Sequence, residues 1–458
     1  MGSRFVVALL LLAACGDNLH GRGVIESGSR LRAKYLVSAG GDRVFQSFHD
    51  QDLDLDCTWE GTSPPRCLPE RWVTEEFRDP SCAQPVVQVG SGPCAEGPAY
   101  VTVELDRCTQ ATTRVWPVGG LISLTTVFRR NASGVCTASS TDPTTNYRMT
   151  GVEVPLDRFV SGRVVDLGGG RILTRTVISD DGAVAPLTAF DREINATCQP
   201  SMTWEACVPE FSGTYLADDA GCTSPVLTTP TACVPPAYIR DSASQELGLF
   251  ERGALVTADP TVPLQLYDRS VYVVATGMHS CTARTVTLRE GVSLYKAGAS
   301  VQVDTLVPVE RVVGDGVRLE PWLLHSGGYS SFDGLYDAQL ERDCTIEVAG
   351  PGIWRCMPES NYVSRFLFAD PQCTQRTSVI FTDDSDDRDD SIAIHHTDDG
   401  TCGKLLEAYH PGIEIASGSV YLLGPNGCEP YTWDGVHAFS VGNNASLDQF
   451  IALTELIE

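Results

Sequence analysis

The chain has 458 residues, of which 33 are Lys or Arg and 59 are Asp or Glu, so its formal net charge at pH 7 is −26. Such an acidic surface repels phosphate backbones and anionic head groups, which excludes nucleic acid as an expected partner. The 42 Gly and 27 Pro, without any long stretch of helical periodicity, favour short strands joined by turns.

The first 15 residues have the organisation of a secretory signal. Arg4 supplies a positive charge, and residues 5–12 form an apolar core that is too short to span a bilayer as a mature helix. The Leu-Ala-Ala-Cys run that ends at Cys15 resembles a bacterial lipobox. We therefore expect export, lipidation of Cys15 and stable anchoring by several acyl chains, in the outer membrane or at the cell surface rather than in the inner membrane. An ordinary signal peptide is the alternative.

After a tether over residues 16–27, the sequence repeats itself three times, with a period of about 145 residues. The units are 28–168, 169–314 and 315–458. Each opens with an Arg before an apolar strand, followed by an Asp, a Cys and then a Cys-apolar-Pro-Glu tetrad. The equivalent polar residues are Arg30, Asp50 and Glu70, then Arg171, Asp191 and Glu210, then Arg318, Asp337 and Glu359.

This repeated polar set has two interpretations. A functional one places three copies of a binding site around a central axis. A structural one makes the set a repeated ion pair or a turn-capping carboxylate, because Asp at strand ends commonly accepts hydrogen bonds from turn amides. We favour the structural interpretation, since every unit carries the set equally.

The spacing of strand-sized segments predicts an all-β fold, because turn residues recur every 8–12 positions. Each unit holds enough segments for two four-stranded blades, so we expect one closed β-propeller with six blades, two per repeat. Closure removes exposed sheet edges. It requires the last strand, near residues 450–457, to pair with the first, residues 31–37. The alternative is three tandem β-sandwich-like domains.

Cysteine usage predicts a disulfide framework. Seventeen Cys minus Cys15 leaves sixteen, an even number in an exported chain, and no Cys-x-x-Cys metal motif occurs. We expect the first Cys of each unit to pair with the second: Cys57–Cys67, Cys198–Cys207 and Cys344–Cys356. We expect the third to pair with the fourth: Cys82–Cys94, Cys222–Cys233 and Cys373–Cys402. Cys108 then pairs with Cys136, and Cys281 and Cys428 remain as free thiols or as partners of each other.

An acidic run at residues 383–390 occurs only in the third unit. Carboxylates are hard oxygen ligands, so Asp384, Asp386 and Asp389 are candidates for binding calcium. The run lacks the Gly and the distal Glu of an EF-hand loop, and a solvated acidic loop is the alternative. No other cofactor is expected, and the sequence contains no Ser/His/Asp constellation or phosphate-binding loop.

The chain resembles a group of uncharacterised, cysteine-rich lipoproteins typical of myxobacteria. The matching residues are the Gly-x-Arg-Leu strand opener, Asp50 before Cys57, the tetrad that begins at Cys67, and the run 77–82. This resemblance implies no activity and no catalytic residue.

We expect a monomeric, non-enzymatic lipoprotein that serves as a binding or interaction scaffold of the cell envelope, with a membrane as one partner and an envelope protein or glycan as another. The alternative is a propeller-type polysaccharide hydrolase or lyase that uses central carboxylates.

Overall fold

The structure is a computed structural model. It describes residues 25–458 except 61–63, 70–73, 90–98, 105–112, 131–134, 142–144, 215, 231–236, 242–247, 257–262, 271–279, 287–291, 351, 359–360, 383–391, 399–403, 425–426 and 434–435. The regular structure of the described residues consists of β-strands and three short 3-10 helices, so the all-β prediction is confirmed.

Each unit begins with a four-stranded antiparallel meander. The first consists of β1 (Leu31–Ser38), β2 (Arg43–Asp50), β3 (Leu55–Glu60) and β4 (Arg66–Pro69). The second consists of β13 (Ile172–Ser179), β14 (Val184–Asp191), β15 (Ala196–Ser201) and β16 (Ala206–Pro209). The third consists of β26 (Leu319–Ser326), β27 (Tyr329–Asp337), β28 (Arg342–Gly350) and β29 (Ile353–Pro358). We call these three meanders together the hub.

A fifth strand completes each meander, and it comes from the end of another unit. The strands are β12 (Gly162–Leu167) on β13, β25 (Glu310–Val313) on β26, and β37 (Ala452–Ile457) on β1. A 3-10 helix precedes each of them: η2 (Leu156–Arg158), η3 (Val303–Thr305) and η5 (Leu447–Gln449). The last strand of the chain therefore lies against the first, with Lys34 opposite Ile457 and Ser38 opposite Leu453, as the sequence predicts.

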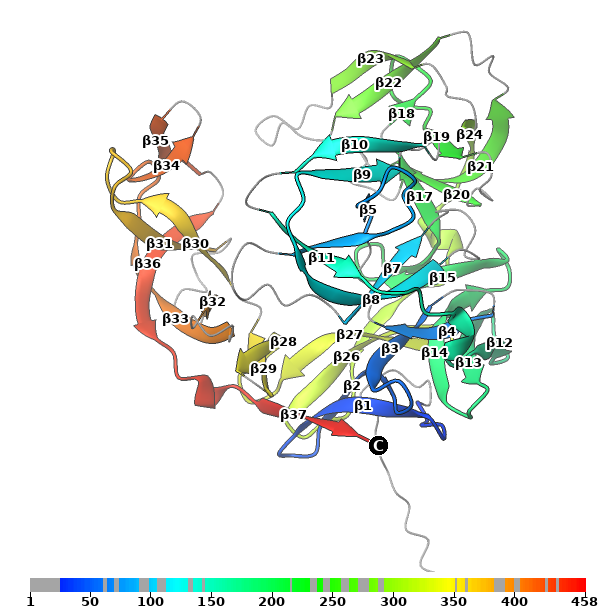
Figure 1. Cartoon of the computed structure of the whole chain (residues 1–458), viewed down its shortest axis with the longest axis horizontal. Helices are drawn as coiled ribbons and strands as arrows, with labels where there is room; N and C mark the ends of the chain where they lie inside the picture. The colour runs from blue at the N-terminus through cyan, green and yellow to red at the C-terminus, as the bar shows by residue number, and fades with distance from the viewer. Residues whose placement is uncertain are drawn as a thin grey trace, which may run out of the picture.

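The rest of each unit forms a β lobe that projects from the hub (Figure 1). Lobe 1 contains β5 (Glu76–Phe77), β6 (Val86–Val89), β7 (Tyr100–Glu104), β8 (Thr113–Ile122), β9 (Thr126–Arg130), β10 (Cys136–Ser140) and β11 (Asn146–Thr150). Lobe 2 contains β17 (Phe211–Thr214), β18 (Leu216–Ala217), β19 (Val226–Pro230), β20 (Tyr238–Asp241), β21 (Leu249–Val256), β22 (Leu264–Ser270), β23 (Ser280–Val286) and β24 (Val292–Ser300). Lobe 3 contains β30 (Asn361–Phe368), β31 (Arg376–Thr382), β32 (Ala393–Asp398), β33 (Lys404–Glu414), β34 (Val420–Gly424), β35 (Gly427–Tyr431) and β36 (His437–Asn444).

The six-bladed propeller is wrong. The strands of a unit divide into a hub meander and a lobe instead of two equal blades, and the sheets remain open. In lobes 1 and 2 the strands form two sheets each, so the alternative of β-sandwich-like domains describes the lobes better. Strand number alone could not separate these architectures, because both use short antiparallel strands joined by turns.

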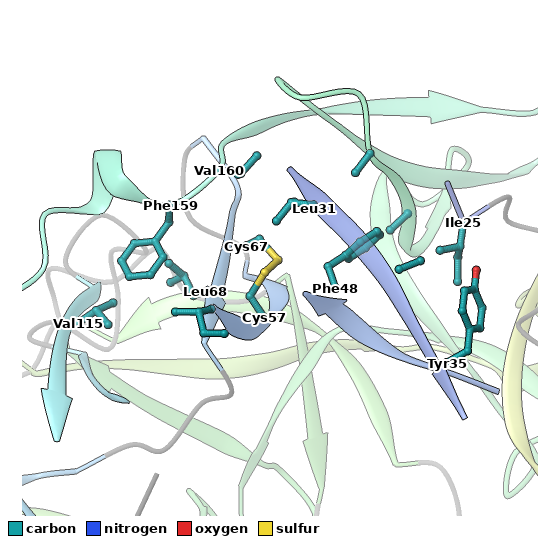
Figure 2. Packing of buried hydrophobic residues seen from close by; sticks show 14 residues of the cluster. Ile25, Leu31, Tyr35, Phe48, Cys57, Cys67, Leu68, Val115, Phe159 and Val160 are labelled. Carbon is teal, nitrogen blue, oxygen red and sulfur yellow. A yellow bond between two sulfur atoms is a disulfide. The ribbon is translucent and has the colours of Figure 1, made fainter. Parts of the chain in front are cut away.

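Three apolar clusters hold the hub together, one at each junction between units. The first joins units 1 and 2 through Leu31, Phe159 and Ala183. Figure 2 shows the Cys57–Cys67 disulfide at its centre. The second cluster joins units 1 and 3 through Leu36 and Leu319, together with Leu453 of the C-terminal strand. The third joins units 2 and 3 and is the smallest, with only six buried residues.

The disulfide prediction is right for the hub meander of each unit and wrong for the lobe. The pairs Cys57–Cys67, Cys198–Cys207 and Cys344–Cys356 form as expected. The third Cys of each unit pairs with the fifth, however, in Cys82–Cys136, Cys222–Cys281 and Cys373–Cys428. The expected bridges Cys82–Cys94, Cys222–Cys233, Cys373–Cys402 and Cys108–Cys136 are therefore wrong, and Cys281 and Cys428 are not orphans. Cys94, Cys108, Cys233 and Cys402 lie outside the described residues.

The physical reason for this pairing is the folding of each lobe. The third Cys follows β5, β18 or β30 early in its lobe, and the fifth Cys lies on a later hairpin, β9–β10, β22–β23 or β34–β35. In lobe 1 this hairpin pairs with β5, and in lobe 2 it pairs with β18, so residues far apart in sequence become neighbours. Each bridge consequently closes a long loop, of 54, 59 and 55 residues.

Leu453 tests the contact between the two ends of the chain. Leu453 is fully buried against residues of units 1 and 3, so Leu453→Ala should lower the free energy of unfolding by about 2–5 kcal/mol. Hydrogen exchange should then accelerate in β1 as well as in β29, because both pair with β37. Leu456→Ala on the same strand is the control, since that side chain is 40% exposed. Unchanged protection of β1 in Leu453→Ala would contradict the junction.

The long-range disulfides give a second prediction. Peptide mapping without reduction should recover Cys222–Cys281 and not Cys222–Cys233. Replacing both Cys222 and Cys281 by Ser should lower stability by about 4 kcal/mol, because the closed loop no longer restricts the unfolded chain. The double variant Cys198→Ser/Cys207→Ser opens a loop of only 9 residues and should lose less from this entropic source. Recovery of Cys222 in a peptide with Cys233 would reject the pairing.

Candidate functional site

The repeated Arg residues tie together three parts of each unit. Arg30 Nε lies 2.7 Å from Asp50 Oδ1, and Arg30 also donates to the carbonyl oxygen of Arg158, at the end of η2. The Asp50 carboxylate accepts the backbone N–H of Asp52 as well. The same clamp recurs at Arg171 with Asp191 and the carbonyl of Thr305, and at Arg318 with Asp337 and the carbonyl of Gln449. The set is thus both ion pair and turn cap.

These clamps occupy the Asp carboxylates that would have to bind a ligand if the repeated set were a functional site. Asp50, Asp191 and Asp337 are fully buried. Hydrogen bonding to the buried carboxylates raises the pKa of Arg30 and Arg171, against the opposing effect of burial. Such a buried, paired carboxylate cannot reach a ligand without breaking the clamp.

Several predicted site residues lie outside the described residues. They are Cys15, Glu70, Glu359 and the calcium candidates Asp384, Asp386 and Asp389. Glu210, the remaining member of the repeated set, is exposed. Within the described part of the chain, no group of three or more His, Cys, Asp or Glu is arranged to hold a metal ion.

A second repeated carboxylate caps the turn that carries the third Cys of each unit. Asp79 accepts hydrogen bonds from the backbone N–H groups of Ser81, Ala83 and Gln84. Asp219 and Asp370 do the same in their units. Desolvation opposes ionisation, but these hydrogen bonds outweigh it and hold the pKa of each Asp below its ordinary value. This role is structural, because it lets the Cys adopt a left-handed conformation.

The junctions between units reveal functional candidates that the sequence alone did not single out. Between units 1 and 2, the turn after β13 places the carboxylate of Asp181 at the start of β1. Asp181 Oδ2 accepts the backbone N–H of Arg30 at 2.8 Å and that of Leu31 at 2.7 Å. The hydroxyl of Ser179 donates to the other carboxylate oxygen.

The junction between units 1 and 3 repeats this arrangement. Asp42, in the turn after β1, accepts the backbone N–H of Val317 at 2.6 Å and that of Leu319 at 3.3 Å. Ser38 Oγ donates to Asp42 Oδ2 at 2.9 Å. In both junctions a Ser at the end of the first strand thus holds an Asp that bridges to the amides at the start of the first strand of another unit.

The third junction, between units 2 and 3, has the Ser but not the Asp. Here the turn after β26 is shortened to Gly327–Gly328, and both residues have positive φ. Next to it lies a pocket of about 410 Å³. Its lining includes Gly169, Ile172 and Gly328 but contains no Asp, Glu, Lys, Arg or His. We call it the junction pocket.

The glycines show how this junction differs from its counterparts. Gly28 and Gly169 both stand two residues before the repeated Arg. A Cβ at Gly28 would collide with the Asp181 carboxylate, whereas nothing lies within 4 Å of a Cβ at Gly169. The junction pocket therefore opens where a carboxylate lies at the junction between units 1 and 2.

The turn residues could have been noticed in the sequence. Each first strand ends in Ser, at Ser38, Ser179 and Ser326, and a turn rich in Gly and Asp follows only in the first two units. Because an Asp in such a turn usually binds its own amides, nothing in the sequence indicates that it reaches another unit.

Asp181→Asn tests the bridging carboxylate. Although burial opposes ionisation, hydrogen bonds from Ser179, Leu31 and Arg30 hold the pKa of Asp181 below its ordinary value. Asp181 therefore stabilises the fold above its unfolded-state pKa, and that stability is lost as the pH falls through the lowered pKa. At pH 7 the variant should lose about 1–2 kcal/mol of unfolding free energy.

The difference between wild type and Asp181→Asn should shrink as the pH falls from about 4, the ordinary pKa of an unfolded Asp, through the lowered pKa of the folded carboxylate. Thermal unfolding as a function of pH measures it. Asp157→Asn, at an exposed residue of η2, should leave the profile unchanged. A constant difference between wild type and Asp181→Asn at all pH values would contradict the role of the charge.

Comparison with known proteins gives a family but no activity. Among the described residues, no helix reaches the length and hydrophobicity of a transmembrane span. No curated protein and no solved structure matches the chain. One family model, described as a family of unknown function (DUF7481), matches residues 7–450. Because this match covers nearly the whole chain, the protein belongs to the DUF7481 family of unknown function.

Proposed function

We propose that the protein is an exported lipoprotein that acts as a non-enzymatic binding scaffold of the cell envelope. The main support for this proposal is that the repeated carboxylates lie apart from the junction pocket. The repeated carboxylates are held inside Arg clamps, and the junction pocket is lined without any ionisable side chain. Such a pocket can hold a ligand, but it offers no titratable side chain for acid–base catalysis, which needs such a group within reach of the substrate.

The disulfides support the proposal that the protein is exported. Six disulfides join described residues, and structural disulfides persist in oxidising compartments outside the cytosol. Retention at a membrane then follows from lipidation at Cys15, because several acyl chains on one Cys give stable anchoring.

The architecture supports the scaffold part of the proposal. The hub holds three lobes whose outer hairpins are each tied back by a long-range disulfide. Figure 1 shows lobe 3, with β30 to β36, projecting away from the hub on one side. Loops and hairpins on a rigid framework are typical positions for binding residues.

Anchoring is tested by Cys15→Ala. The variant should move from the membrane fraction to the soluble exported fraction and should no longer incorporate labelled fatty acid, because the acylated sulfur is lost. Asn18→Ala, in the expected tether, is the control and should stay with the membrane. An unchanged distribution of Cys15→Ala would reject the lipoprotein part of the proposal. Release of reducing ends from envelope polysaccharides by the purified protein would reject the non-enzymatic part.

A further inference from the structure

The junction pocket differs from the two other hub junctions by one functional group. Residues Leu31, Ile172 and Leu319 are equivalent, each directly after the repeated Arg. The backbone N–H groups of Leu31 and Leu319 donate to Asp181 and Asp42, respectively. The lining around Ile172 in the third junction provides no carboxylate for the corresponding N–H.

An unpaired hydroxyl lies in the residue next to the pocket lining, because Ser326 directly precedes the lining residue Gly327. Ser326 is only 1% exposed, and its Oγ is buried without a hydrogen-bond partner. Its counterparts Ser38 and Ser179 each donate their hydroxyl to the bridging Asp. A buried hydroxyl without a partner costs about 1–3 kcal/mol, so its retention in the third unit points to an acceptor that comes from elsewhere.

We propose that the junction pocket binds the carboxylate of a peptide C terminus or of a small organic acid. The carboxylate takes the place of Asp42 and Asp181, and accepts hydrogen bonds from Ser326 Oγ and the backbone N–H of Ile172. The inference rests on the proposed binding function and names the ligand class for it.

The size and lining of the pocket indicate that the ligand has an apolar part in addition to its carboxylate. A volume of about 410 Å³ lies in the range of small-molecule sites and exceeds the needs of one carboxylate. Leu167, Ile172 and Val184 supply an apolar part of the lining. Ligands with an apolar group next to the carboxylate, such as N-acetyl-leucine or a peptide ending in Leu, fit this chemistry.

Gly169→Ala is the blocking variant. Gly169 has no positive φ that would strain an Ala, and its Cβ would stand where the Asp181 carboxylate meets Gly28 in the first junction. Gly120→Ala is the matched control, because this exposed glycine of lobe 1 also has open space around an added Cβ. Both variants should fold like wild type.

The test is calorimetric titration of the purified full-length protein with N-acetyl-leucine, the tripeptide Ala-Ala-Leu, and the C-terminal amide of each. The acids should bind at least tenfold more tightly than their amides, which is about 1.4 kcal/mol or more. Gly169→Ala should weaken binding of the acids at least tenfold, and Gly120→Ala should not. Tighter binding of the tripeptide than of N-acetyl-leucine would assign a peptide C terminus, and the reverse would assign a small acid.

Ser326→Ala separates a binding role from a structural one. It should weaken binding of the acids while leaving the unfolding temperature unchanged or higher, because it removes a buried unpaired hydroxyl. Ser179→Ala should instead lower the unfolding temperature and leave binding unchanged. Equal affinity for acids and amides, or no binding of any acid up to about 10 mM, overturns the inference. Membrane association that depends on Cys15, and the absence of polysaccharide cleavage, would be unaffected in that case, so this failure is distinct from failure of the proposed function.

Discussion

The hub depends on the exchange of one strand between units. A four-stranded meander leaves an unpaired edge, and an exposed edge invites pairing with another chain. Here β12, β25 and β37 each cover the edge of a meander to which they do not belong in sequence. Every unit thus needs its neighbour to complete its sheet, and β1 needs the last strand of the chain. The stability of one unit therefore cannot be separated from that of the other two.

This exchange explains why the same polar residues recur in each unit. An Arg at the start of a first strand must satisfy its own charge and also fix the 3-10 helix that leads into the exchanged strand. The second Cys of each unit donates its backbone N–H to the residue just beyond that helix, at Val160, Val307 and Ile451. These contacts are needed at all three junctions, so they are repeated. A group that is absent from one junction is accordingly more informative about function than a group present in all three.

The sequence predicts those features whose cause is local. The period of the units, the all-β class, and the pairing of Cys57 with Cys67 all follow from residues close together in the chain. The pairing of β37 with β1 was also predictable, because the free edges of the first and last strands have to be covered. The division into hub and lobes was not, since it depends on which of many similar strands pair.

The third-to-fifth disulfides show the same limit. The sequence separation from Cys373 to Cys402 is more than twice that from Cys82 to Cys94. The sequence separations of the bridges that form, Cys82–Cys136 and Cys373–Cys428, are nearly equal. Regular spacing would have favoured Cys136 as the partner of Cys82 and Cys428 as the partner of Cys373. When the fold is unknown, however, a bridge that closes a short loop is the easier assumption. The junction pocket was hidden for a related reason. It is created by the absence of an Asp beside Ser326, and this absence has meaning only when three-dimensional equivalents can be compared.

The acidity of the whole chain does not prevent a carboxylate from binding in the junction pocket. At physiological ionic strength, charges are screened over about 8 Å, so the distant acids contribute little to the energy at the site. Backbone N–H groups and a hydroxyl act at hydrogen-bond distance, in surroundings where such bonds are stronger than in water. At the equivalent junction, burial opposes ionisation of Asp181, but hydrogen bonds from Ser179, Leu31 and Arg30 outweigh it and hold the pKa of this turn carboxylate below its ordinary value. The net negative charge of the chain acts instead on the rate of association. It slows the approach of ligands with a second negative charge more than that of ligands that are neutral or basic beyond the carboxylate.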